Sequence, residues 1–527
     1  MQDDRFLMRT LRRISQILFL LFSLYLFLAS TYPLVTKIPV DLFLRSDPLI
    51  ALSSIVSARS YIDTFVFALI LLIITIPLGR YFCGWVCPLG TTLDVVSYIT
   101  KNKVGKSLKK LSSLKYYILI FLSIGILFAS PLVWFLDPLS LLTRSLTLSL
   151  FPIVTLIFTQ LFNLGFRIGT SQDFLANLQL FLSSTLLPTT LTFFRFSGWI
   201  LLILSAIIFS EFISRRFWCR NLCPLGAFYA FFSRYQILRR RVKQDCNLCG
   251  DCQRFCKMDA IADDFKMTKD SECILCFDCV KDCPPKVTTI NFRSRLKPLQ
   301  FDKLTALSEV EGRFRYLDLS KRGFLYSLAG GLISVGLFKT TFKDRNLKSR
   351  LIRPPGSREE PEFLDRCIRC HQCIKVCSSS GRFLQPSFLE GGFEALWTPI
   401  GVARYGYCEY NCVMCTQVCP TGAIHKLDLK TKKKTVIGLA YIDRSRCIPW
   451  YKNEKCIVCE EQCPVPDKAI LLKEEKAIGF DGTEKKVLRP YVKEDLCIGC
   501  GICETKCPVE GESAIKITPQ NEQRWKD

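Results

Sequence analysis

Long apolar runs separated by polar, mostly basic loops make up the first half of the chain. The clearest apolar runs occupy residues 14–35, 62–82, 116–136 and 199–213. A helical run of about 20 apolar residues crosses the ~30 Å hydrocarbon core of a bilayer. The stretch 139–194 is interrupted by Pro152, Gly165, Asp173 and Pro188 and forms either a hairpin at the outer face or a further pair of crossings. The pattern predicts a multi-pass helical membrane domain over residues 1–235.

Basic residues at the ends of these runs predict which side of the membrane each loop occupies. Arg5, Arg9, Arg12 and Arg13 precede the first run, and the loop 101–115 is rich in lysine. Cytoplasmic loops carry such an excess of positive charge, so we expect both segments on the cytoplasmic side. The first run lacks a small-residue cleavage site, and we interpret it as a retained anchor.

A cysteine motif occurs twice, each time at the end of an apolar run. Residues 80–90 read Arg-Tyr-Phe-Cys-Gly-Trp-Val-Cys-Pro-Leu-Gly, and residues 216–226 read Arg-Phe-Trp-Cys-Arg-Asn-Leu-Cys-Pro-Leu-Gly. On a helix the two cysteines of each copy would share one face. The four candidate catalytic cysteines are Cys83, Cys87, Cys219 and Cys223. They would ligate an additional iron–sulfur centre, act as two redox-active thiol pairs, or simply be small buried residues.

An arginine precedes the first cysteine of each copy by three residues. Arg80 and Arg216 are either anchors at the end of a span or stabilise the negative charge of a cluster or a semiquinone.

Eight cysteines in ferredoxin spacing follow over residues 236–300. They are Cys246, Cys249, Cys252, Cys256, Cys273, Cys276, Cys279 and Cys283. In a two-cluster ferredoxin three thiolates of each group bind one cubane cluster, and the fourth binds the other. We therefore expect one cluster on Cys246, Cys249, Cys252 and Cys283, and another on Cys273, Cys276, Cys279 and Cys256. Lys257 stands where a proline usually follows the first group.

A polar linker, residues 301–355, separates the two cysteine-rich regions. It contains Ser320-Lys321-Arg322-Gly323-Phe324-Leu325, followed by an apolar segment. This sequence resembles a twin-arginine export signal with Lys in place of the first Arg, which would carry a folded domain across the membrane. The alternative is a plain membrane anchor or a buried helix.

Four further cysteine groups occupy residues 356–527. They are Cys367, Cys370, Cys373, Cys377; Cys408, Cys412, Cys415, Cys419; Cys447, Cys456, Cys459, Cys463; and Cys497, Cys500, Cys503, Cys507. The spacing predicts a four-cluster module but leaves open whether neighbouring groups pair, or the first pairs with the fourth and the second with the third. Cys367 to His371 also matches a haem-attachment sequence, but Cys373 and Cys377 complete a ferredoxin group directly afterwards.

Composition narrows the remaining possibilities. Of 28 cysteines in 527 residues, 24 fall into six groups of four and four into the repeated motif, which indicates metal ligation rather than a disulfide framework. The net charge of +24 is concentrated beside apolar runs, so we do not expect a nucleic-acid partner. With two histidines, a multihaem protein is disfavoured.

As a set, these motifs resemble two related families. Residues 1 to about 300 resemble the NapH/NosR-type membrane polyferredoxins, and residues from about 315 onward resemble the MauM/NapG ferredoxin-type proteins, as if the two were fused. The expected fold is an α-helical membrane domain with α+β ferredoxin-like domains, one a two-cluster and one a four-cluster module.

The resemblance implies a quinol dehydrogenase-type component of the bacterial inner membrane. It would oxidise quinol and pass electrons along six 4Fe-4S clusters, with a possible seventh centre on the repeated motif, to an extracytoplasmic reductase such as periplasmic nitrate reductase, or to a cytochrome. The first ferredoxin domain would be cytoplasmic and the last periplasmic. The alternative is an accessory protein that supplies electrons for maturing or reactivating a metalloenzyme.

Overall fold

The computed structural model describes most of the chain, in two compact units. The described residues are 2–34, 36–100, 111–128, 132–168, 172–185, 193–233, 235–281, 283, 287–292, 319–340, 351–478 and 484–526. Most of the lysine-rich loop and much of the predicted linker lie outside them. Unit 1 comprises Met1–Phe27, Leu42–Leu142 and Leu201–Leu337, and unit 2 comprises Leu28–Asp41, Thr143–Ile200 and Phe338–Asp527.

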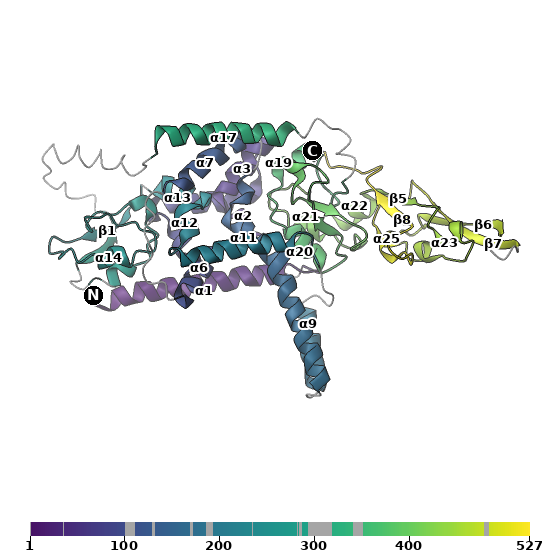
Figure 1. Cartoon of the computed structure of the whole chain (residues 1–527), viewed down its shortest axis with the longest axis horizontal. Helices are drawn as coiled ribbons and strands as arrows, with labels where there is room; N and C mark the ends of the chain where they lie inside the picture. The colour runs from purple at the N-terminus through teal and green to yellow at the C-terminus, as the bar shows by residue number, and fades with distance from the viewer. Residues whose placement is uncertain are drawn as a thin grey trace. The chain divides into compact units, whose positions relative to one another are not determined.

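Unit 1 is mainly helical and carries one small antiparallel sheet (Figure 1). Its elements, some of which run into unit 2, are α1 (Gln2–Ala29), α2 (Leu42–Arg45), α3 (Pro48–Ala58), η1 (Asp63–Phe65), α4 (Val66–Leu78), α5 (Tyr81–Trp85), α6 (Pro88–Ile99), α7 (Leu114–Leu127), η3 (Leu132–Phe135), α8 (Pro138–Ser145), α11 (Ser197–Phe209), η5 (Ser210–Phe212), α12 (Phe217–Asn221), α13 (Pro224–Ser233), β1 (Leu238–Val242), α14 (Asp251–Arg254), η6 (Asp270–Glu272), α15 (Asp278–Lys281), β2 (Thr288–Phe292) and α17 (Lys321–Thr340).

Unit 2 combines two apolar helices with a cysteine-rich region of short helices and two-stranded sheets. Its elements are η4 (Leu146–Leu150), α9 (Phe151–Ile168), α10 (Gln172–Thr185), α19 (Glu360–Arg366), α20 (Gln372–Ser378), β3 (Leu384–Pro386), η8 (Phe393–Ala395), β4 (Pro399–Gly401), α21 (Met414–Gln417), α22 (Leu429–Lys434), β5 (Leu439–Ile442), α23 (Ile448–Tyr451), α24 (Val458–Glu461), β6 (Ile470–Ile478), β7 (Glu484–Val492), α25 (Ile502–Lys506) and β8 (Ile515–Thr518).

Several apolar helices have the composition of membrane spans. Among the described residues, Leu7–Ala29 and Pro138–Ile168 are long and apolar enough to cross a bilayer. Shorter apolar helices cover Pro48–Ala58, Asp63–Leu78, Leu114–Leu127 and Ser197–Phe212. Apart from Pro48–Ala58, which lies between two of the apolar runs, these segments overlap the runs of the sequence, and several helices are shorter than the runs because turns and caps take up their ends.

Each cysteine-rich region is built on antiparallel strand pairs. In unit 1, β1 pairs with β2, with Leu238 opposite Phe292. In unit 2, β5 pairs with β8, β3 with β4, and β6 with β7. The β6–β7 hairpin is inserted between the third and fourth cysteine groups of unit 2. These pairs bring distant cysteine groups together, which positions the candidate site.

Candidate iron–sulfur sites

The two copies of the repeated motif, residues 80–90 and 216–226, fold alike and are called the motif pair below. In each copy a short helix carries the first cysteine, and the second cysteine directly precedes a helix that starts with proline. The two cysteines of a copy therefore do not lie on one continuous helix, as the helical interpretation assumed. Cys87 has an extended backbone, because a residue before proline is disfavoured in helical geometry.

The second cysteine of each copy accepts a hydrogen bond from a backbone amide. Gly90 N–H donates to Cys87 Sγ at 3.5 Å, and Gly226 N–H donates to Cys223 Sγ at 3.3 Å. Amide donors of this kind stabilise a negatively charged sulfur and tune the potential of a cluster bound to it. The repeated Pro-Leu-Gly sequence therefore has a chemical role in addition to starting a helix.

The four cysteines of the motif pair, here called the four-thiol site, lie close enough to interact electrostatically with one another. Three are buried and Cys83 is half-buried. Burial raises the pKa of Cys219 to about 12 and also raises the pKa of Cys87 and Cys223. Without a metal Cys87, Cys219 and Cys223 hold their protons, and iron would displace those protons on binding.

Arg80 and Arg216, the first residues of the two copies, are fully buried and cross between the copies. Arg216 donates to the carbonyl oxygen of Cys83 at 2.8 Å and to that of Gly90 at 3.1 Å. Arg80 reaches the other copy, where its Nη2 would lie 2.6 Å from a Cβ placed on Gly226. Neither side chain lies exposed at a span end, so neither is an interfacial anchor of the kind considered from the sequence.

Arg80 also keeps unused donors beside the thiols. Its Nε and Nη2 are buried and have no hydrogen-bond partner within the described part of the chain. Unsatisfied donors on a buried cation are costly and mark a place where an anionic group would fit. Together with the convergent thiols and the two amide donors, they fit a negatively charged iron–sulfur cluster. When bound, such a cluster supplies reversible one-electron storage.

Unit 1 also brings together one of the cysteine sets expected in its ferredoxin region. Cys256, Cys273, Cys276 and Cys279 line one cavity, together with Arg240 and apolar side chains. We call these four cysteines the proximal set. The set expected on Cys246, Cys249, Cys252 and Cys283 has its first three members near one another, and Cys283 follows α15 in the chain.

Unit 2 pairs its cysteine groups as neighbours, which the spacing had left open. In each case three cysteines of one group come together with the last cysteine of its neighbour. The four sets are Cys367, Cys370, Cys373 with Cys419; Cys408, Cys412, Cys415 with Cys377; Cys447, Cys456, Cys459 with Cys507; and Cys497, Cys500, Cys503 with Cys463. This exchange of the fourth cysteine is the two-cluster ferredoxin arrangement, present twice.

A backbone hydrogen bond joins the two ferredoxin pairs of unit 2. Cys408 N–H donates to the carbonyl oxygen of Cys500 at 2.8 Å. Cys408 and Cys500 belong to different pairs, and their thiols also interact electrostatically. The sets that contain them are therefore the adjacent members of the two pairs, which arranges the four sets as a continuous series.

The neighbour pairing predicts which cysteine substitutions remove the same cluster signal. Cys419→Ser and Cys370→Ser should each remove the same cluster, because both thiols belong to one set. The loss should be about four iron atoms per chain. Low-temperature electron paramagnetic resonance of the reduced full-length protein would measure it. If Cys419→Ser instead removes the signal that Cys412→Ser removes, the pairing is wrong.

His371, the histidine of the haem-like sequence, has a structural role. It is buried, and its Nε2 lies 2.7 Å from the carbonyl oxygen of Trp397. Burial and the nearby charge of Arg144 lower the pKa of His371 to about 3. A carbonyl oxygen only accepts, so Nε2 carries the hydrogen of a neutral ring. Cys367 and Cys370 of the haem-like sequence belong to one of the four-cysteine sets.

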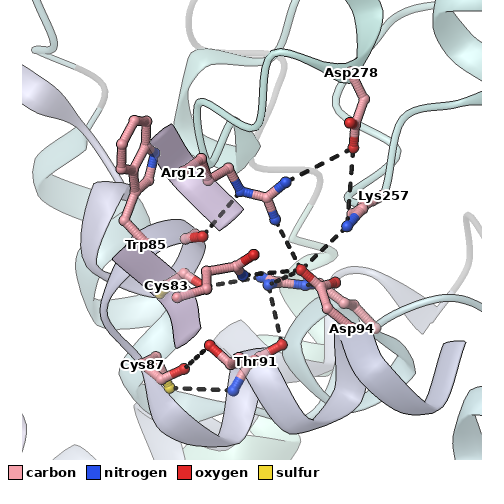
Figure 2. Close-up of polar contacts among 12 residues, drawn as sticks. Arg12, Cys83, Trp85, Cys87, Thr91, Asp94, Lys257 and Asp278 are labelled. Carbon is pink, nitrogen blue, oxygen red and sulfur yellow. Dashed lines mark hydrogen bonds and ion pairs between the residues drawn. The ribbon is translucent and has the colours of Figure 1, made fainter. Parts of the chain in front are cut away.

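Two acidic residues at the motif pair were not anticipated from the sequence. Asp94 accepts from Arg216 at 2.9 Å and from Arg12 at 2.8 Å (Figure 2). Glu272 accepts from Arg80 at 2.7 Å. Each buried arginine of the motif pair thus has its own carboxylate.

Among the described residues, no three His, Cys, Asp or Glu side chains surround one point closely enough to hold a single metal ion.

Comparison with known families supports iron–sulfur binding in both parts of the chain. Residues 62–107 and 196–243 match a family model described as a 4Fe-4S binding domain, and these segments contain the motif pair. Residues 490–511 match a second model with the same description. No solved structure matches the chain.

Comparison with curated proteins identifies ferredoxin-type relatives. The chain is 35% identical over 200 residues to the methylamine utilization ferredoxin-type protein MauM of Methylorubrum extorquens, an alignment that covers 36% of this chain and 84% of that protein. It is 34% identical over 197 residues to the ferredoxin-type protein NapG of Escherichia coli, covering 36% and 80%. It is 26% identical over 269 residues to the ferredoxin-type protein NapH of Haemophilus influenzae, covering 48% and 77%.

Proposed function

Because the chain belongs to the family of ferredoxin-type proteins that includes MauM and NapG, we propose that it is a membrane-bound component that oxidises quinol and passes single electrons through iron–sulfur clusters. The observation that carries this proposal is the gathering of cysteines in sets of four, with the fourth cysteine exchanged between neighbouring groups. Five such sets are gathered, and we propose a sixth on Cys246, Cys249, Cys252 and Cys283, which gives six 4Fe-4S clusters on the 24 ferredoxin-type cysteines.

The four-thiol site is proposed to hold a seventh iron–sulfur centre. The match of both motif segments to a 4Fe-4S binding model supports it, as do the buried thiols and the unused donors of Arg80. Two redox-active thiol pairs are the alternative, and either arrangement would make Cys83, Cys87, Cys219 and Cys223 the redox-active residues of the membrane domain.

A multi-pass location in the bacterial inner membrane is proposed for the helical part. The apolar helices support it, and several of them expose large apolar side chains. On α4 these include Leu69 and Ile73, each 57% exposed, and on α1 they include Leu18 and Leu21. Exposed apolar surface of this extent is suited to lipid.

The sidedness and the partners remain part of the proposal. The basic amino terminus supports a cytoplasmic position for residues 1–13 and for the first ferredoxin region. We further propose that the carboxy-terminal ferredoxin region is periplasmic, that the chain joins NapH-like and MauM/NapG-like parts, and that the acceptor is an extracytoplasmic reductase or cytochrome, such as periplasmic nitrate reductase. The likeness to NapH, NapG and MauM supports this choice.

Anaerobic reduction by a quinol tests the proposed function. The oxidised full-length protein in detergent is mixed with a menaquinol analogue, and the cluster absorbance is followed together with the paramagnetic signals. Rapid bleaching is the expected result, with one quinol delivering two electrons and releasing two protons. Reduction by dithionite but not by quinol would contradict quinol oxidation and favour the accessory role with a soluble donor.

A further inference from the structure

The ferredoxin region of unit 1 contacts the motif pair through residues that flank the proximal set. Glu272 directly precedes Cys273, and it accepts from Arg80 at 2.7 Å and from the hydroxyl of Tyr116 at 2.6 Å. The ammonium group of Lys115 also binds Glu272. Arg80, Lys115 and Glu272 are largely buried, so the geometry of this contact is tightly constrained.

Lys257 makes a second contact on the other side of the same cysteine set. It directly follows Cys256, and its Nζ lies 3.1 Å from Asp94 and 3.9 Å from Asp278 (Figure 2). Asp94 in turn holds Arg216 of the motif pair. The lysine occupies the position where ferredoxins usually have proline, and the contact with Asp94 gives this departure a physical explanation.

The backbones of the two parts approach each other closely at Gly84. A Cβ placed on Gly84 would lie 2.3 Å from the carbonyl oxygen of Ile274, so only glycine fits at this distance. The neighbouring Trp85 donates from Nε1 to the carbonyl oxygen of Leu275 at 3.1 Å. Gly84 follows Cys83 of the four-thiol site, and Ile274 follows Cys273 of the proximal set. A short covalent and contact path therefore joins the two thiol sets.

The second copy of the motif contacts the same region differently. The residue that corresponds to Gly84 is Arg220, and its Nη2 lies 3.1 Å from the carboxylate of Asp259. Asp259 is three residues after Cys256. The repeat is thus asymmetric where it meets the ferredoxin region: the first copy gives close backbone contact, and the second gives an ion pair.

We propose that the proximal set is the one that exchanges electrons with the four-thiol site, and that Gly84, Lys257 and Glu272 are positioning residues that hold the two sets together. The inference rests on the proposed function, because it assumes that both sets carry redox centres. An electron that crosses the junction oxidises one centre and reduces the other by one electron, with no bond formed or broken and no proton transferred. The remaining set, Cys246, Cys249, Cys252 and Cys283, is then distal.

Two kinds of variant disturb this junction in the full-length protein without touching a cysteine. Gly84→Ala forces Ile274 and its neighbours away from the motif pair. The double variant Lys257→Met with Glu272→Gln removes the ion pair between Lys257 and Asp94 and the ion pair between Glu272 and Arg80. Matched controls are Gly336→Ala, where a Cβ would meet nothing within 4 Å, and Lys266→Met, an exposed lysine of the same ferredoxin region.

Hydrogen exchange and paramagnetic coupling provide readouts other than activity. With the iron content measured first, we expect Gly84→Ala to increase backbone amide exchange over residues 271–279 by about tenfold. In the dithionite-reduced protein, the broadening that neighbouring spins cause in each other's signals should weaken. Both control variants should show the same amide exchange and the same signal broadening as the protein without substitutions. If the double variant does not fold, Gly84→Ala alone still tests the proposal.

Two results would overturn the inference. One is spin coupling between the proximal set and the four-thiol site that persists at full strength in Gly84→Ala although backbone amide exchange over residues 271–279 becomes faster. The other is coupling to the four-thiol site that disappears when Cys249 is replaced by Ala but survives changes at the junction. Because dithionite supplies the electrons, failure of quinol to reduce the protein would count against the proposed donor and leave this test intact.

Discussion

Asp94→Asn is expected to lower the free energy of unfolding by about 3–5 kcal/mol, because it leaves buried cations without their counterion. The Asp94 carboxylate contacts Arg216 at 2.9 Å, Arg12 at 2.8 Å and Lys257 at 3.1 Å. Burial alone would raise the pKa of Asp94, but the three positive charges outweigh it and hold that pKa well below its usual range. The group is therefore ionised in the folded protein.

The thermal unfolding of the full-length protein in detergent would measure this effect. A loss of this size in a domain of this length corresponds to a fall in the midpoint on the order of 10 °C. Asp63→Asn is the matched control, since Asp63 is exposed and a surface change of this kind usually costs less than about 0.5 kcal/mol. Equal midpoints for the two variants would show that the charges around Asp94 do not stabilise unit 1.

The proximal set of unit 1 follows from sequence spacing because the ligands of a ferredoxin group are local. Cys273, Cys276 and Cys279 share one short loop, and the exchange of a fourth thiol such as Cys256 is a property of the motif. The pairing in unit 2 did not follow from spacing. It depends on pairing between distant strands, such as β5 with β8, and no local signal distinguishes one partner group from another.

The break in the chain at Cys87 had a local signal that the helical interpretation missed. Proline at position 88 disfavours helical geometry in the residue before it, and the same holds for Cys223 before Pro224. The spacing of two cysteines four residues apart was taken to mean one helical face. Two short segments that meet at the second cysteine produce the same spacing, and thiols of the two copies interact electrostatically.

Asp94 and Glu272 could not have been selected from the sequence, because nothing in the residues beside either one distinguishes it from an ordinary acidic residue. Their role depends on arginines that are 122 residues away from Asp94 and 192 away from Glu272. One indirect signal was present. Lys257 replaces the usual proline, and an unusual charged residue beside a cluster ligand indicates a contact outside the ferredoxin region.

The crossing arginines explain why the motif occurs twice. Arg216 binds the backbone of the first copy, and Arg80 lies against Gly226 of the second. A buried guanidinium must be paired or it destabilises the fold, and Arg216 finds its backbone partners in the first copy, so the second copy is not complete without the first. Two copies together also provide four thiols, the number that one cubane cluster requires.

The double variant Cys87→Ser with Cys223→Ser is expected to lose about four iron atoms per chain, the content of one 4Fe-4S cluster. Cys87 and Cys223 belong to different copies, and serine preserves size at each buried position. The ferredoxin sets keep all their thiols, so their signals should remain. Iron analysis and the paramagnetic spectrum of the reduced protein would measure the loss. This measurement does not depend on whether quinol reduces the protein.

Cys503→Ser is the matched control for this experiment, because Cys503 is a buried member of one ferredoxin set in unit 2. It should also lose about four iron atoms, but with a different signal. Unchanged iron in the Cys87 and Cys223 variant would contradict a seventh cluster. In that case, disulfide formation within the motif pair on oxidation of the protein that keeps all four cysteines would identify them as two redox-active thiol pairs. The junction at Gly84 would then join thiols to a cluster.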